Sequence, residues 1–120
     1  MKAEELTALL RRLPPAPRTC LETVWRLQGE MHECLEAGEW AAAGEIERSR
    51  AHALEGAYRD ANGLEPDEAE ALAALTQALL DSDREVVGQV MAAREELARE
   101  LGSLRRNQRA VSAYTRHEGA

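Results

Sequence analysis

The sequence has 120 residues, no Phe, a 3% share of aromatic residues and an apolar content carried mainly by Ala, Leu and Val. Strand-forming residues are sparse and no segment alternates apolar and polar residues, so this composition excludes a β protein and favours an all-α fold in one domain. The formal net charge of -7 argues against direct, general binding to nucleic acid.

The charge is distributed unevenly along the chain. Residues 19–98 hold 18 acidic and 6 basic residues, a net charge of -12 (6 minus 18), whereas both ends of the chain are basic. The simplest interpretation is that the acidic residues keep the protein soluble and that the arginines interact favourably with the C-terminus of a helix. The alternative is a basic tail that docks on an acidic partner.

Targeting signals are not evident in the sequence. There is no run of the roughly 20 apolar residues that a membrane span needs, and the first apolar residues are interrupted by Arg11 and Arg12. We therefore expect a cytoplasmic protein without a membrane span.

Residues 1–18 are predicted to form an arm that contains one short helix. The helix would cover residues 3–13, and the prolines of "LPPAPR" would stop it because they remove backbone donors and force extended backbone. Its apolar side would carry four leucines: Leu6, Leu9, Leu10 and Leu13. The pattern does not indicate whether this arm is ordered.

The next two helices are predicted to form an antiparallel hairpin. The first runs from about Thr19, a suitable N-cap, to about Glu36, and Gly38 ends it in the left-handed conformation. The second runs from about Glu39 to Ala61 and has a thin apolar side made mainly of small residues. Together with the long helix that follows, they would form a three-helix domain over residues 19–104.

Two cysteines and two tryptophans fall in this hairpin. Cys20 and Cys34 lie on one helix about 21 Å apart, beyond the ~7 Å that a disulfide can bridge, so we expect free and mostly buried thiols. Trp25 and Trp40 are expected in the core. Trp40 would close the end of the hairpin core against residues 86–90.

The third helix is predicted to start at Pro66, which suits the first helical position, and to continue to about Leu101. Ser82 and Asp83 interrupt its apolar stripe. After residue 102 the pattern loosens, and residues 105–120 are predicted to form a basic tail with a short helix. The stripe comprises Leu72, Leu75, Leu79, Val86, Val90, Ala93, Leu97 and Leu101.

The three helices differ in length. At about 1.5 Å per residue they measure ~27, ~34 and ~52 Å, so the third is too long for the hairpin beside it. Beyond about Val90 its apolar residues would have no hairpin to pack on, and an exposed stripe of this kind usually marks an interaction site. Three segments are candidates to cover these apolar residues: the tail folding back on the helix, a second copy of the protein in a homodimer, or a helix from a partner.

No catalytic or metal-binding pattern occurs in the chain. In "HECLE", His32 and Glu36 lie one turn apart while Cys34 points elsewhere, which is typical of a solvated helix face. Arginines in the second helix are explained by pairing with neighbouring glutamates one turn away. We therefore expect no enzyme and no cofactor. The arginines are Arg48, Arg50 and Arg59, and the glutamates are Glu45, Glu47 and Glu55.

Two stretches of the chain carry recognisable landmarks: "CLEAGEWAAAGEIERSRAHALE" contains a Gly-x-Trp turn, and "QVMAAREELARELGSLRRNQRAVSAY" ends in Ala-Tyr. They resemble flagellar export chaperones of the FliT type. The first is similar to the family segment in which such a turn joins two helices, and the second is similar to the family's long third helix. The resemblance covers roughly residues 20–116. Residues 1–18 are unlike the usual start of the family, and relatives often continue further after the position of Tyr114.

The resemblance implies a cytoplasmic chaperone that binds the C-terminal segment of the flagellar filament-cap protein and delivers it to the type III export apparatus. It implies further contacts with the export ATPase and, through Tyr114, with the export gate. We expect the client-binding groove on the third helix, at Val86, Val87, Val90, Met91, Leu97 and Leu101. The basic tail would carry Arg105, Arg106 and Arg109.

Two other functions remain open from the sequence. One is a structural helical module that only dimerises. The other is a regulator that antagonises a flagellar transcription factor through its basic tail, a role the resemblance extends to some relatives. The sequence leaves open which client residues are bound, whether the tail covers the groove at rest, and the oligomeric state.

Overall fold

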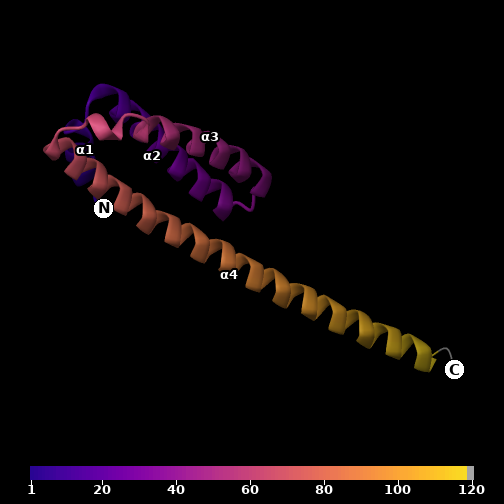
Figure 1. Cartoon of the computed structure of the whole chain (residues 1–120). Coiled ribbons are helices and arrows are strands. Elements are labelled where there is room, and N and C mark those ends of the chain that lie inside the picture. Colours follow the sequence, from indigo (N-terminus) through magenta and orange to yellow (C-terminus); the bar gives the residue numbers. More distant parts are fainter. Residues whose placement is uncertain (119–120) are drawn as a thin grey trace. The chain divides into compact units, whose positions relative to one another are not determined.

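The computed structural model describes residues 1–118 and consists of helices joined by short turns (Figure 1). This confirms the all-α prediction. The helices are α1 (Ala3–Arg11), α2 (Pro15–Glu36), α3 (Trp40–Tyr58), the short 3-10 helix η1 (Ala61–Gly63) and α4 (Pro66–Glu118).

The chain divides into two compact units, residues 1–86 and residues 87–120. The first unit contains α1, α2, α3, η1 and the start of α4. The second unit contains the rest of α4. The N-terminal segment falls in the first unit, and α4 continues past residue 104 in the second. The predicted division of the chain after residues 18 and 104 stays a prediction.

The hairpin of α2 and α3 is present as predicted, with the two helices side by side in Figure 1. Gly38 has φ of 74°, the left-handed conformation that a glycine adopts without a steric penalty. The backbone N–H of Glu39 donates to the carbonyl of Cys34 at 2.8 Å, so the turn satisfies one of the last carbonyls of α2.

The core of the first unit lies between α2, the end of α3 and the start of α4. Leu21, Val24 and Leu75 have no exposed surface, and Leu72 and Leu79 extend the same apolar side of α4. Full burial of a side chain of this size contributes about 1.5–3 kcal/mol to stability. The stripe predicted for this part of the third helix therefore packs as a core.

The N-terminal segment is part of this core and is not a separate arm. Leu10 and Leu13 are buried, and Leu6 and Leu9 pack against the same cluster. The segment is tied down by Arg18, whose guanidinium donates to the carbonyls of Leu10, Arg11 and Leu13 at the end of α1. The short helix predicted over residues 3–13 thus forms, and the leucines on its apolar side explain why it packs.

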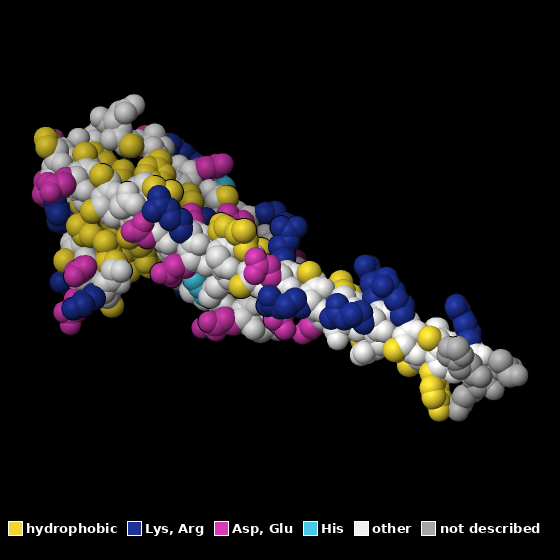
Figure 2. All heavy atoms as spheres, turned by 90° about the horizontal axis from the view of Figure 1, so that it is seen from below, with side chains coloured by type: hydrophobic (Ala, Val, Ile, Leu, Met, Phe, Trp, Pro, Cys, Tyr) yellow, Lys and Arg dark blue, Asp and Glu magenta, His cyan; other side chains and the backbone are white. Residues whose placement is uncertain are grey.

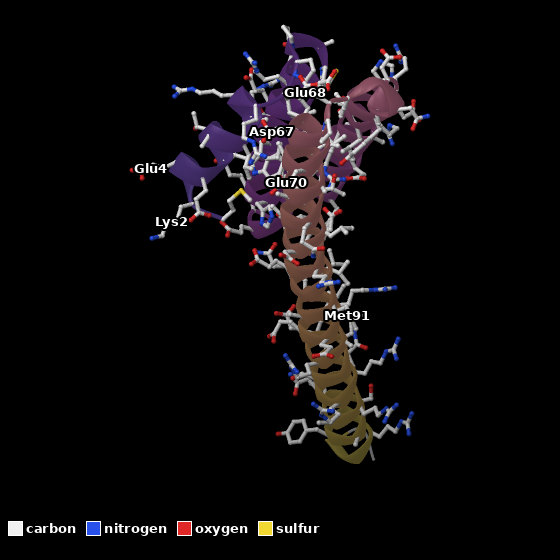
Figure 3. All side chains as sticks on the ribbon, turned by 60° about the vertical axis from the view of Figure 1, so that its left-hand side comes forward. Lys2, Glu4, Asp67, Glu68, Glu70 and Met91 are labelled. Carbon is white, nitrogen blue, oxygen red and sulfur yellow. The ribbon has the colours of Figure 1, made fainter. Side chains whose placement is uncertain are left out.

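A second contact joins the N-terminal segment to the start of α4. The Nη2 atom of Arg12 lies 2.7 Å from an Asp67 carboxylate oxygen and 3.5 Å from Glu70. Figure 3 shows Asp67 and Glu70 together on the first turns of α4. The hydrogen bond to Asp67 raises the pKa of Arg12 above its ordinary value.

The predicted start of α2 at Thr19 is wrong, because the helix begins four residues earlier at Pro15. The first helical turn leaves backbone N–H groups without partners in any case, so proline is tolerated there and its fixed φ favours the helix. Pro15 is therefore the first residue of α2, although the sequence pattern predicted extended backbone at this proline. The hydroxyl of Thr19 donates to the carbonyl of Pro15 inside the helix.

The prediction that Trp40 lies in the core is also wrong. Its side chain is 50% exposed, whereas the core cluster is made of buried residues. The expected contact of Trp40 with residues 86–90 stays a prediction. Trp40 is the first residue of α3, directly after the turn, and Ala43 occupies the buried position one turn later. Trp25 is partly buried and packs against the core cluster.

The long helix does not end near Leu101 but continues to Glu118. A glycine inside a helix costs roughly 0.5–1 kcal/mol relative to alanine, which weakens the helix without stopping it. The segments 97–101 and 104–110 around Gly102 include Leu, Ala, Arg, Glu and Gln residues that favour helix, so the expected break does not occur. The described residues of the predicted basic tail, 105–118, form the last part of α4, and residues 119–120 lie outside the described residues.

Candidate binding surface

The residues expected to form a client-binding groove lie on α4 and are largely exposed. Val87, Met91, Leu97 and Leu101 are between 46% and 57% exposed, whereas Val86 and Val90 are partly buried. Val86 belongs to the first unit, so only the other five share one unit. We call these five, Val87, Val90, Met91, Leu97 and Leu101, the apolar stripe.

The apolar stripe is one-sided. At about 100° per residue, Val87, Val90, Leu97 and Leu101 fall within about 80° of the helix circumference, and Met91 lies at the edge of this sector. Figure 3 labels Met91 on α4, farther along the helix than Glu70. Large apolar side chains on one side of a solvated helix are typical of a surface that binds another helix.

The three arginines of the expected basic tail are exposed on the last turns of α4. Within the residues that the structure describes, Arg105, Arg106 and Arg109 form no ion pair, whereas Arg99 pairs with Glu96 at 2.8 Å. On the face seen in Figure 2, dark-blue arginines continue toward the grey atoms after the last acidic side chains. Residues 101–116 of α4 therefore carry positive charge and contain no acidic residue.

Tyr114 lies near the end of α4 with 65% of its surface exposed. It belongs to the second unit, as do the apolar stripe and the basic tail. The position of its side chain near the end of a helix suits contact with a partner, but its expected role at the export gate stays a prediction.

A buried polar network in the first unit was not predicted from the sequence. Arg50 is only 5% exposed, and its guanidinium contacts Gln28 and Asp83 at 2.5 Å each. The amide of Gln28 donates to the hydroxyl of Ser82 at 2.9 Å. The expected pairing of Arg50 with Glu47 is also present, at 3.4 Å.

This network connects α2, α3 and α4. No buried side-chain nitrogen or oxygen lacks a hydrogen-bond partner among the residues described, so the buried cation and the buried amide are both satisfied. Its members on α4 are Ser82 and Asp83, the two residues that interrupt the apolar positions predicted between Leu72 and Leu101 of the third helix. That interruption was the available sequence signal, and it marks a polar contact between three helices.

The two cysteines are free thiols, as expected, although both are only partly buried. Burial raises the pKa of the Cys34 thiol, and the nearby carboxylates of Glu39, Glu33 and Glu30 act in the same direction. The Cys34 thiol is therefore less ionised near neutral pH than an ordinary cysteine.

Sites of other kinds were searched over the part of the chain with described positions. In that part, no group of three or more His, Cys, Asp or Glu side chains is placed to hold a metal ion. No helix there has the length and apolar content to cross a membrane.

The fold and the exposed apolar stripe define an all-helical protein with a surface suited to binding other helices. A protein-family model described as flagellar protein FliT matches residues 18–116, and the chain belongs to this family. The chain is therefore a flagellar export chaperone, the role that membership of this family implies. Searches of curated proteins and of solved structures gave no significant match.

Proposed function

We propose that the protein is a cytoplasmic chaperone that binds the C-terminal segment of the filament-cap protein and delivers it to the type III export apparatus. The observation that supports this most is the apolar stripe in a member of the FliT family, with Val87, Met91 and Leu97 each more than half exposed. A surface of this kind fits an amphipathic helix of the client.

The client proposal is tested with Val90→Asp combined with Leu97→Asp. Two carboxylates placed in the apolar stripe would lose their hydration when a client helix packs on it, so binding should weaken by at least about a hundredfold. Affinity for the C-terminal segment of the cap protein is measured by isothermal titration calorimetry, and helix content by circular dichroism.

The matched control is Ala92→Asp combined with Ser103→Asp. It adds the same two charges to exposed positions on the opposite side of the same helix. The control should bind the client nearly as well as the unmodified protein. Unchanged affinity of the stripe variant, or an equal loss in both variants, would contradict a client site on the stripe.

A purely structural dimer is the main competing function. It would keep the apolar stripe buried between two copies at all concentrations. Sedimentation analysis over a wide range of protein concentrations, with and without the client segment, separates the two. A chaperone should exchange any self-association for a client complex, whereas a structural dimer should remain unchanged.

We also propose that Tyr114 contacts the export gate, and that the export ATPase is a further partner. Tyr114→Ala should weaken binding to the cytoplasmic part of the gate by about tenfold, since an exposed aromatic side chain often contributes 1–2 kcal/mol at an interface. The same variant should bind the client segment normally. A general loss of stability in thermal unfolding would instead indicate that Tyr114 anchors the end of the helix.

A further inference from the structure

Three arginines form a stripe of their own on the last turns of α4. At about 100° per residue, Arg105, Arg109 and Arg116 fall within about 40° of the helix circumference. With Gln108, Ser112 and Ala113 they line a shallow hollow of about 350 Å³. We call Arg105, Arg109 and Arg116 the basic stripe.

The basic stripe has no counter-charge on its own segment. Residues 101–116 contain four arginines and no Asp or Glu. Within the described part of the chain, none of the three arginines forms an ion pair. Like charges one turn apart destabilise a helix, so the stripe is unfavourable for the free protein.

The helix dipole does not explain the basic stripe. Its favourable effect on a cation is confined to the last turn of a helix. α4 ends at Glu118, so Arg105 and Arg109 lie more than two turns before the end. Only Arg116 is close enough to benefit. The arrangement therefore indicates an external anion.

An apolar seam runs beside the basic stripe. The seam consists of Leu101, Leu104 and Val111, which are 46–65% exposed. Together with Gln108, these residues follow the alternating three- and four-residue spacing of the a and d positions of a coiled coil. Their directions span about 80°, next to the direction of the arginines. A narrow seam of this kind is typical of contact with one other helix.

Two other classes of ligand fit less well. A bilayer surface favours a broad apolar face, and Glu95, Glu96 and Glu100 one or two turns earlier would be repelled by anionic lipid. A nucleic acid would neutralise the arginines but would leave the apolar seam uncovered. A protein helix satisfies both features at once.

We propose that Leu101, Leu104, Val111 and the basic stripe bind an amphipathic α-helix of a partner protein whose apolar seam is flanked by Asp and Glu. The partner's carboxylates face the arginines across the edge of the helix pair. This does not rest on the client proposal. The two surfaces share Leu101, and the charged residues tested below lie outside the client surface.

The probe is a synthetic peptide of about four heptads with Leu and Val in its seam and Glu at both flanking positions. Carboxylates on two copies of the peptide repel each other, so the free peptide remains monomeric until it binds a basic partner. A second peptide has Lys in place of every Glu. Binding of the full-length chain to each peptide is measured by fluorescence anisotropy.

The test variant is Arg105→Gln, Arg109→Gln and Arg116→Gln combined. The matched control replaces three exposed arginines of the first unit, Arg48, Arg59 and Arg84, with Gln, which changes the net charge equally. Each exposed charge pair contributes about two- to threefold to binding, so the test variant should bind the Glu peptide about tenfold more weakly. The control should differ from the unmodified chain by less than about twofold.

Binding of the Glu peptide should also weaken as salt rises from about 0.05 to 0.5 M. The proposal is overturned if the unmodified chain does not bind the Glu peptide, binds the Lys peptide equally well, or loses the same affinity in both triple variants. Tighter binding to duplex DNA or to vesicles of anionic phospholipid would also overturn it, in favour of those ligands.

The client proposal is checked separately with the same proteins. The C-terminal segment of the cap protein should bind the basic-stripe variant as it binds the unmodified chain. If that segment binds neither protein while the Glu peptide distinguishes them, the client proposal fails and the basic stripe retains its role.

Discussion

α4 has two environments along its length. In the first unit, Leu72, Leu75 and Leu79 are buried in a core shared with other helices, and Thr76 forms a hydrogen bond with Tyr58 of α3. In the second unit, the ion pair of Arg99 with Glu96 and the hydrogen bond of Thr115 with the Val111 carbonyl both lie within the helix. The leucines of the two units therefore have different roles.

The difference indicates where the protein can bind partners without unfolding. Side chains of the first unit are needed for the core, so a ligand that displaced them would cost stability. The large apolar side chains of the second unit from Val87 to Val111 are about half exposed or more, with Val90 more covered. A partner that covers them gains apolar burial at little cost to the fold.

The largest expected effect comes from comparing one leucine of each unit. Leu75 has no exposed surface and Leu104 is 57% exposed. Leu75→Ala should lower the free energy of unfolding by about 3 kcal/mol, because it leaves a cavity in the core. Leu104→Ala should change it by less than about 0.5 kcal/mol. Urea unfolding followed by circular dichroism measures both, and similar losses in the two variants would remove the distinction between the units.

A smaller effect is expected from the polar network of the first unit. Arg50→Met should lower the free energy of unfolding by about 2 kcal/mol, because it removes the cation that joins Gln28 to Asp83. This value is below that of a fully buried ion pair, since the Asp83 side chain is 41% exposed. Arg48→Met on the exposed side of the same helix is the control and should be nearly neutral. A neutral result for Arg50→Met would mean that apolar packing alone positions α4 in the first unit.

The helical architecture could be predicted from the sequence because its signals are local. Apolar residues recur at helical spacing in each segment, Gly38 ends α2, and Pro66 starts α4. The excess length of the third helix also predicted apolar residues without a core to pack on, and the exposure of Val87 and Leu97 agrees with it. Their binding role stays a prediction.

Features that depend on contacts distant in the sequence were missed. Arg50 was assigned to Glu47, three residues away, whereas its closest contacts come from Gln28 and Asp83. The prolines at residues 14 and 15 gave the correct stop for α1 but hid the start of α2, since the same residue type ends one helix and favours the first turn of another. Trp40 was expected in the core, and its position beside the turn leaves it exposed.

The smallest expected effect concerns thiol reactivity in the two units. Cys34 is studied in Cys20→Ala protein, and an exposed comparator is made by adding Met91→Cys to protein that lacks both native cysteines. Ionised thiol is the reactive form, and burial raises the pKa of Cys34, so Cys34 should react with iodoacetamide more slowly than the cysteine at position 91 near neutral pH. As pH rises, the rate for Cys34 should increase at higher pH than the rate for the comparator. Denaturation in urea should bring the two rates closer together, because the burial of Cys34 and the fixed positions of the carboxylates around it are then lost. Equal rates in the folded proteins would mean that the end of α2 is as open to water as the second unit, and would weaken the contrast between the units at that point.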